Sequence, residues 1–135
     1  MRTHKKRRIF IVITMSLVLV LLFLYNLDSI YVETKIMAQF PEKIVGFTKK
    51  KKQTDFVYTL LCTNEQFLDF IQEIEQKGFK KNHGLTIIYS KNLSILCDPT
   101  IDDLYIGNRN RIYTPAIIHK KNESKLYLII ADGMM

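Results

Sequence analysis

The chain has few of the residues from which enzymes and metal proteins build their sites. It has only two cysteines, Cys62 and Cys97, and three histidines. A four-ligand zinc centre would therefore also need His83 and His119, at a spacing that no zinc motif has. Glycine-rich phosphate loops, the G-x-S-x-G nucleophile turn and the H-E-x-x-H metal motif are missing too. The sequence thus predicts no cofactor, no metal ion and no catalytic nucleophile.

Internal repeats, low-complexity stretches and linkers rich in proline, glycine or serine are also missing. The remaining composition is rich in isoleucine, leucine, tyrosine, phenylalanine, lysine and asparagine, which is typical of a folded domain and not of a disordered tail. Roughly 110 residues follow the first 25, enough for one small domain with a modest core.

One long apolar run dominates the first part of the chain. Residues 9–25 are apolar except for Thr14 and Ser16, whose hydroxyls can bond to their own helix. At a rise of about 1.5 Å per residue the run spans roughly 26 Å, and Arg8 and Tyr25 can extend it to the bilayer interfaces. Because the run has no polar face, a buried helix of a soluble protein is a poor alternative. We therefore predict a cytoplasmic basic tail over 1–8 and a transmembrane signal-anchor helix over 9–27.

A cleaved signal peptide is the main rival of this anchor, since it also combines a basic start with an apolar stretch. Cleavage needs small residues at the −3 and −1 positions, and residues 24–30, LYNLDSI, do not provide them. We expect an uncleaved anchor, with a secreted domain after cleavage as the alternative.

Charge predicts the orientation of this anchor. Five basic residues precede the apolar run, whereas the stretch just after it carries Asp28 and Glu33. The positive-inside rule places the N-terminus in the cytoplasm and the rest of this single-pass protein outside the cell membrane. The net charge of +7 is concentrated in the tail, because residues 29–135 carry 15 basic and 12 acidic side chains. A nucleic-acid partner is therefore not expected.

The segment after the anchor is expected to begin with a stalk and a hairpin. Apolar residues at roughly helical spacing predict a stalk or linker over 28–42, which Pro41 ends. Residues 43–48 and 55–62 are rich in β-branched and aromatic side chains and are predicted as strands. The polar stretch 49–54 between them is expected to form the hairpin loop.

The clearest local signal predicts a helix after this hairpin. Thr63 and Gln66 have the spacing of a capping box, and Gly78 can end the helix in a left-handed conformation. Apolar residues recur at helical spacing between them, which predicts a face that packs on a sheet. The apolar face consists of Phe67, Phe70, Ile71 and Ile74.

Beyond this helix the apolar period changes to two, which predicts antiparallel strands. They are expected at 85–89, 93–97, 104–106, 111–119 and 125–131. Asn92 can adopt a positive φ in the first hairpin loop. We therefore predict an α+β extracytoplasmic domain over 43–135, a ββα unit followed by a β meander, with one helix packed on an antiparallel sheet.

The two cysteines leave two alternatives open. A disulfide between Cys62 and Cys97 is chemically allowed outside the cytoplasm, and closing a loop of about 35 residues would stabilise the fold by roughly 3–4 kcal/mol. Two small buried thiols are an equally good interpretation. Neither cysteine has the local signature of a nucleophile.

Three acidic residues, Asp98, Asp102 and Asp103, lie close together in the sequence. Their order lacks the alternating oxygens and central glycine of a calcium loop, so we expect a turn. A small envelope enzyme would use Asp102 or Asp103 as its acid or base. Its partner would be His83 or His119, and these groups would have to converge in a concave site.

Two basic segments can contact an anionic partner, although solvated loops are the simpler interpretation. Their residues are Lys49, Lys50, Lys51, Lys52, Arg109 and Arg111. We expect a membrane-anchored, non-enzymatic domain that binds a protein or peptide outside the membrane, in complex assembly, in regulation or in neutralising a toxin. No small-molecule substrate is expected. The alternative is the small envelope enzyme.

Overall fold

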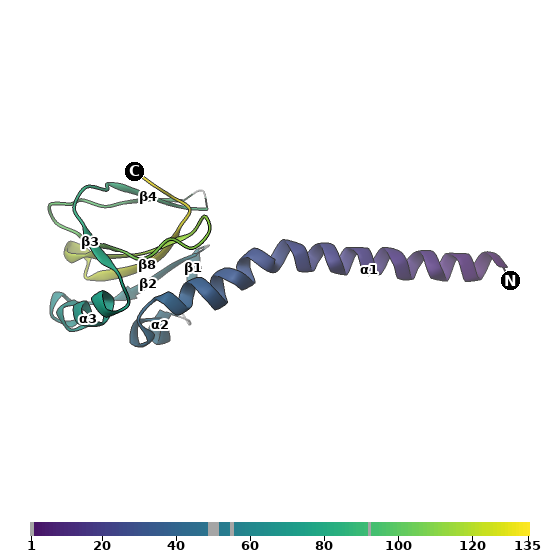
Figure 1. Cartoon of the computed structure of the whole chain (residues 1–135), viewed down its shortest axis with the longest axis horizontal. Helices are drawn as coiled ribbons and strands as arrows, with labels where there is room; N and C mark the ends of the chain where they lie inside the picture. The colour runs from purple at the N-terminus through teal and green to yellow at the C-terminus, as the bar shows by residue number, and fades with distance from the viewer. Residues whose placement is uncertain (1, 49–51, 55, 92) are drawn as a thin grey trace. The chain divides into compact units, whose positions relative to one another are not determined.

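The structure is a computed structural model of the chain that describes residues 2–48, 52–54, 56–91 and 93–135. These residues form two compact units, Met1–Tyr31 and Val32–Met135. Figure 1 labels the main helices and strands of both units.

The first unit is the helix α1, Arg2–Tyr31. Its stretch His4–Leu24 is, among the described residues, the one helix that is long and apolar enough to cross a membrane. None of this stretch is buried, and its large apolar side chains from residue 9 to residue 24 are between 49% and 70% exposed. As expected, the Thr14 hydroxyl bonds within its own helix, donating to the Phe10 carbonyl at 2.8 Å.

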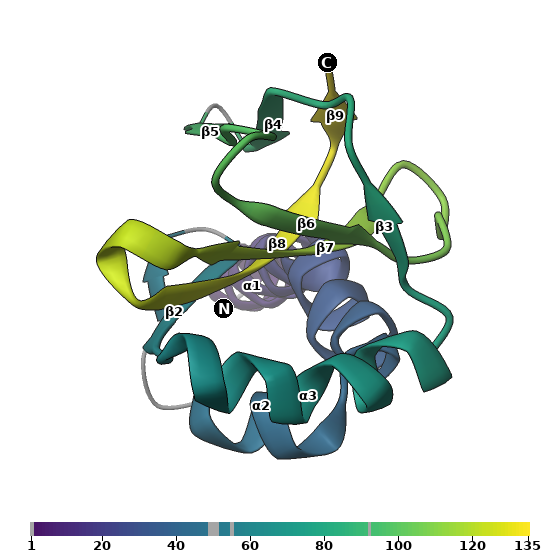
Figure 2. The same ribbon diagram turned by 90° about the vertical axis from the view of Figure 1, so that its left-hand side faces the viewer.

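The second unit has a layer of helices, a six-stranded sheet and a three-stranded sheet (Figure 2). The six-stranded antiparallel sheet has the order β1-β2-β8-β7-β6-β3. Its strands are β1 (Lys52–Thr54), β2 (Val57–Leu61), β3 (Lys80–Asn82), β6 (Asp103–Ile106), β7 (Thr114–Lys120) and β8 (Lys125–Ala131). The three-stranded sheet consists of β5 (Leu93–Leu96), β4 (Ile87–Ser90) and β9 (Gly133–Met134), in that order.

The described residues of this unit also form five helical segments of different types. They are the π-helix η1 (Val32–Ile36), the 3-10 helices η2 (Met37–Gln39) and η3 (Lys121–Glu123), and the α-helices α2 (Glu42–Thr48) and α3 (Asn64–Gln76). In Figure 2, α2 and α3 cover one face of the large sheet and the small sheet covers the other. Because β7 and β8 are covered on both faces, their sequences are nearly continuously apolar.

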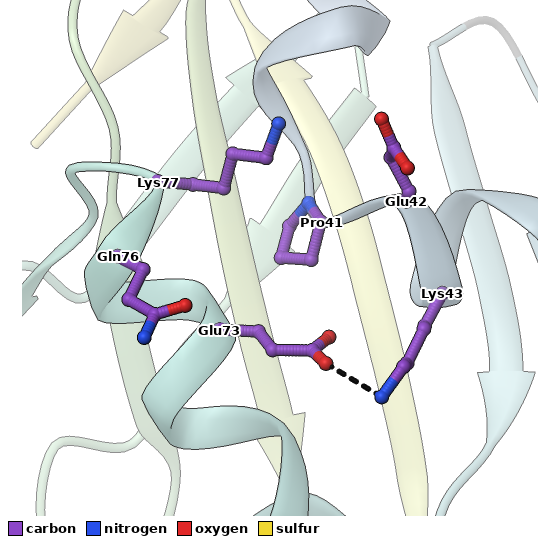
Figure 3. Close-up of a pocket in the computed structure, with 6 residues that line it drawn as sticks. All are labelled: Pro41, Glu42, Lys43, Glu73, Gln76 and Lys77. Carbon is purple, nitrogen blue, oxygen red and sulfur yellow. Dashed lines mark ion pairs between the residues drawn. The ribbon is translucent and has the colours of Figure 1, made fainter.

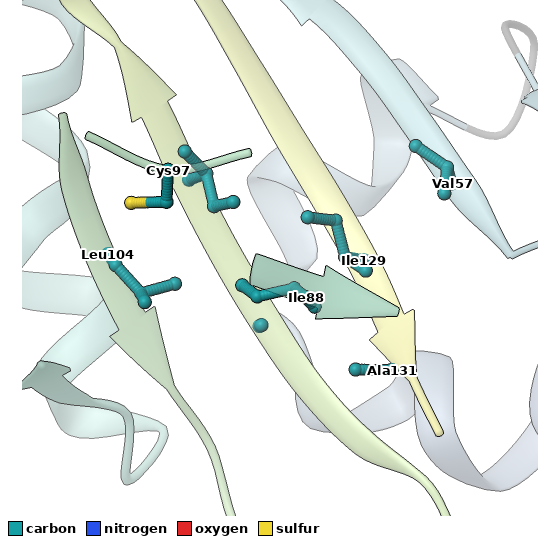
Figure 4. Close-up of a cluster of buried hydrophobic side chains, with 8 residues drawn as sticks. Val57, Ile88, Cys97, Leu104, Ile129 and Ala131 are labelled. Atoms are coloured by element: carbon teal, nitrogen blue, oxygen red, sulfur yellow. The ribbon is translucent and has the colours of Figure 1, made fainter. Parts of the chain in front are cut away.

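An apolar cluster fills the space between the two sheets (Figure 4). Ile88 of the small sheet is fully buried there against residues of the large sheet. The cluster consists of Val57, Ile88, Cys97, Leu104, Ala116, Ile118, Ile129 and Ala131. On the helix-covered face, Phe67 of α3 contacts the rings of Tyr105 and His119. The α+β class is therefore as predicted.

Both ends of α3 follow the signals in the sequence. The Gln66 N–H donates to the Thr63 hydroxyl at 3.2 Å, and the Thr63 N–H donates to the Gln66 side chain at 3.0 Å. At the other end Gly78 has φ +90°. The Phe79 N–H returns to the Ile74 carbonyl at 3.2 Å, which closes the helix with a left-handed cap. The predicted capping box and glycine stop are confirmed.

The predicted stalk over 28–42 needs correction. α1 continues to Tyr31, and the next residues belong to the domain instead of leading to it. Val32 and Ile36 are fully buried, and Phe40 packs against Phe79 at a ring distance of 5.5 Å. These apolar residues do have helical spacing, but they pack into the domain core.

The predicted strand over 43–48 is wrong, because these residues form α2. Pro41 precedes the helix, and its carbonyl accepts the N–H groups of Ile44 and Val45. Ile44 is fully buried, so burial of one helical face outweighs the strand propensity of this stretch.

The predicted arrangement of one helix on one sheet also needs correction. Two helices cover the large sheet, and β4 and β5 form a second sheet with β9 instead of continuing a meander. Asn92 lies outside the described residues.

Candidate functional site

The large sheet brings together one of the acid–histidine pairs that the enzyme hypothesis needs. In the register of β6 and β7, Asp103 lies directly opposite His119. Such cross-strand neighbours have Cβ atoms about 4.5–5.5 Å apart, on the same face of the sheet. His83 follows β3, is exposed, and takes no part in this pair.

His119 is sealed from solvent. Its exposed fraction is 0%, and its ring stacks on Phe67 at a centroid distance of 4.3 Å. Nε2 lies 3.1 Å from the Cys62 carbonyl, which can only accept, so Nε2 carries the proton. Nδ1 is buried and bonds to no group that the structure describes. A substrate has no access to this ring.

Asp103 already has two cationic partners. Its carboxylate is within 3.3 Å of the Lys81 amine and 3.4 Å of the Lys121 amine, and its side chain is 15% exposed. These two ion pairs join Asp103 of β6 to β3 and to η3. This arrangement suits a structural ion-pair network better than a general base.

The carboxylates of the acidic turn over residues 98–102 accept hydrogen bonds from within the turn. The Asp98 N–H donates to the Asp102 carboxylate at 3.0 Å, and the Asp98 carboxylate accepts the Thr100 hydroxyl at 2.6 Å and its N–H at 3.0 Å. The bonds from Thr100, the hydroxyl first, lower the pKa of Asp98. Within the described part of the chain, no group of three or more histidine, cysteine or acidic side chains is placed to hold a metal.

The two cysteines are free buried thiols in the structure. The Cys62 carbonyl bonds to His119 at the helix-covered face, whereas Cys97 lies in the cluster between the sheets. Burial raises the pKa of both thiols. Buried thiols with raised pKa values are poor nucleophiles.

Of the two predicted basic segments, the structure fully describes the one that contains Arg109 and Arg111. Lys49–Lys51 lie outside the described residues, and of Lys52 only its position at the start of β1 is described. Arg109 and Arg111 are both exposed in the turn between β6 and β7. The Arg109 Nε donates to the Arg111 carbonyl at 2.9 Å, which fixes the conformation of this turn.

A surface depression between α2 and α3 was missed from the sequence. Its volume is about 390 Å³, and it is lined by Pro41, Glu42, Lys43, Glu73, Gln76 and Lys77 (Figure 3). The Lys43 amine lies 2.9 Å from the Glu73 carboxylate, and this hydrogen bond raises the pKa of Lys43. The site presents both signs of charge and contains neither histidine nor cysteine. The depression depends on residues 43–48 being helical, whereas the sequence predicts a strand there.

No protein-family model matches the chain, and no curated protein or solved structure is significantly similar to it. The described residues offer a sealed histidine, two buried thiols and an open depression of mixed charge.

Proposed function

We propose that this protein is a single-pass membrane protein whose domain, Val32–Met135, binds a protein or peptide partner outside the cytoplasm without catalysing a reaction. The observation that carries the proposal is the exposure of the apolar helix. The stretch His4–Leu24 contains no buried residue, and the apolar cluster of the domain consists of the domain's own residues. Such a helix needs another apolar environment.

A lipid bilayer fits this helix in length and in composition. Its apolar run, residues 9–25, spans roughly 26 Å, and Arg8 and Tyr25 can extend it to the roughly 30 Å of a bilayer core. Leucine, isoleucine, phenylalanine and valine each favour the centre of the bilayer by about 0.3–0.6 kcal/mol. The basic residues before residue 9 favour a cytoplasmic N-terminus, which places the domain on the opposite side.

The depression between α2 and α3 is the best candidate for the partner site. The Lys43 side chain is 74% exposed and that of Glu73 is 28% exposed, so their ion pair contributes little to stability. Both groups can therefore exchange this contact for charges of a partner at little cost. A polar peptide segment with charges of both signs is the ligand that such a surface fits.

The enzyme alternative has one observation in its favour, the pairing of Asp103 with His119. It would require Phe67 to leave the His119 ring and Asp103 to give up its lysine partners. The binding proposal requires neither rearrangement.

Orientation is testable with an engineered cysteine. Because Cys62 and Cys97 are buried, the unmodified protein serves as the control that an impermeant maleimide does not label. The variant His83→Cys places a thiol at an exposed position. We expect labelling of this variant on intact cells, and retention of the protein in carbonate-washed membranes. Labelling only after lysis would contradict the proposed orientation.

The partner site is testable with a charge swap. A photo-crosslinking residue at Gln76 should form adducts in membranes, whereas one at Asn122, in the exposed turn between β7 and β8, should not. Lys43→Glu combined with Glu73→Lys keeps the ion pair and reverses its direction. We expect the adducts to disappear in this double variant while stability is unchanged. Equal adducts from both positions would rule the site out.

A further inference from the structure

The turn between β6 and β7 combines cations with an exposed apolar side chain. This arginine turn, Gly107–Tyr113, carries Arg109 and Arg111, both exposed, and Ile112, which is 57% exposed. The sequence has no acidic residue between Asp103 and Glu123. The turn is therefore a tip that carries two cations and one exposed apolar side chain.

The arginine turn is preorganised. Asn110 and Tyr113 exchange two backbone hydrogen bonds, of 2.8 and 3.0 Å, and the Arg109 Nε donates to the Arg111 carbonyl. Arg111 has φ +57°, a left-handed conformation that non-glycine residues rarely adopt. Backbone held in such a conformation is found preferentially at binding sites.

Buried aromatic rings anchor this turn and bring a third cation near it. Tyr113 is 4% exposed and meets the Phe56 ring edge-on at 5.9 Å. The amine of Lys91, from the turn between β4 and β5, lies 4.1 Å from the centroid of the same Phe56 ring. The two turns therefore share one end of the sandwich, and both are cationic.

The length of chain after the apolar stretch limits how far the domain can be from a bilayer. The candidate membrane-spanning stretch ends at Leu24, and Val32 is already fully buried in the domain. Eight residues can span at most about 29 Å when fully extended, and about 12 Å as a helix. If the helix is anchored as proposed above, the domain is held within reach of the lipid headgroups.

We propose that the arginine turn docks on anionic phospholipid headgroups of the bilayer that anchors the chain. The guanidinium groups of Arg109 and Arg111 are suited to phosphate oxygens, which they can bind through two parallel hydrogen bonds. Ile112 enters the interfacial region between headgroups and acyl chains. This inference rests on the proposed anchor and names one surface that the domain contacts.

The test uses the absence of tryptophan from the chain. The variant Ile112→Trp gives a single reporter at the turn, and Leu68→Trp, at a position 66% exposed on α3, gives a matched control. The full chain is reconstituted in vesicles of phosphatidylcholine alone, or of phosphatidylcholine with phosphatidylglycerol. Both vesicle types are also prepared with brominated acyl chains, which quench only nearby tryptophan.

We expect emission from Ile112→Trp to shift to the blue and to be quenched by brominated lipid in anionic vesicles, several-fold more than that of Leu68→Trp. Adding Arg109→Gln and Arg111→Gln to the reporter variant should abolish both effects. Protection of Cys62 and Cys97 from a thiol reagent shows that each variant is folded.

Each contrary outcome has a separate meaning. Protein that does not float with the vesicles would refute the anchor. Floating protein without quenching at position 112, with equal quenching at position 68, or with equal quenching in neutral vesicles would overturn the docking proposal alone. A blue shift that brominated lipid does not quench would show that a protein surface covers the turn, which also overturns it.

Discussion

Gly107 offers a sharp test of the packing between the helix-covered face and the strands. A Cβ atom at this position would lie 2.8 Å from the Pro115 Cγ and 2.9 Å from the Phe79 Cε1. Neither neighbour can move easily, because Pro115 is buried within β7 and Phe79 is buried against Phe40. We expect overpacking in Gly107→Ala to cost about 1–3 kcal/mol.

Gly84 provides the matched control for this substitution. A Cβ there has no atom within 4 Å, and its backbone is outside the left-handed region. Gly84→Ala should stabilise the protein by about 0.4–1 kcal/mol, because alanine restricts the unfolded chain. Alanine restricts the unfolded chain in the same way in Gly107→Ala. The difference in the free energy of unfolding between the two variants therefore measures only the steric cost, about 1–3 kcal/mol.

The rate at which a thiol reagent labels the two buried cysteines is the assay. Cys62 and Cys97 are 1% and 4% exposed, so they react with a thiol reagent only when the domain opens. A difference of about 1–3 kcal/mol corresponds to roughly 5- to 150-fold faster labelling of Gly107→Ala than of Gly84→Ala, when opening is in rapid equilibrium. Equal labelling rates would refute the packing argument for Gly107.

Three further predictions concern a cap, an ion-pair network and pH. Thr63→Ala removes the capping box of α3 and should cost about 1 kcal/mol, measured as a shift of the urea midpoint. Asp103→Asn removes two ion pairs whose lysines are each 45% exposed, so it should cost no more than about 1 kcal/mol, and less at high salt. Burial raises the pKa of the Cys62 and Cys97 thiols above its value in the unfolded chain. Their contribution to the free energy of unfolding is therefore fully present below about pH 8.5, and it is lost as the pH rises through the folded-state pKa. The urea midpoint should therefore fall at alkaline pH, and a variant with alanine at both positions should show a smaller fall.

The sequence predicted those elements whose signals are local. The capping box at Thr63 and the glycine at position 78 define α3 within a residue or two at each end. The hairpin of β7 and β8 was also predicted, because two long apolar strands flank a polar turn. In these segments propensity, apolar period and tertiary packing all agree.

Residues 32–48 could not be assigned from local signals. Their apolar side chains fit a stalk and a strand as well as they fit two buried helical segments, and only contacts distant in the sequence decide between these. Phe40 packs on Phe79, and Lys43 pairs with Glu73, across more than 29 residues in each case. Such contacts override the strand propensity of a short apolar stretch.

The candidate sites also depend on contacts between residues that are distant in the sequence. Pairing of Asp103 with His119 depends on the register of β6 and β7, and a shift by one residue would put them on opposite faces. The depression between α2 and α3 exists only because residues 42–48 are helical. By contrast, the exposure of Arg109 and Arg111 was predictable, because they lie in a polar turn between two strands.

The burial of Val32 has a functional consequence that can be tested by lengthening the chain. If the short segment from Leu24 to Val32 holds the arginine turn near the bilayer, inserting about 16 glycine and serine residues between Tyr31 and Val32 should lower the effective concentration of lipid roughly fivefold. Quenching of Ile112→Trp by brominated lipid should fall accordingly. Thiol protection should stay unchanged, because the insertion precedes the first buried residue of the domain. The same segment appended after Met135 is the control. Equal quenching in both proteins would mean that the short segment does not hold the domain at the membrane, and that the turn binds lipid strongly enough without it.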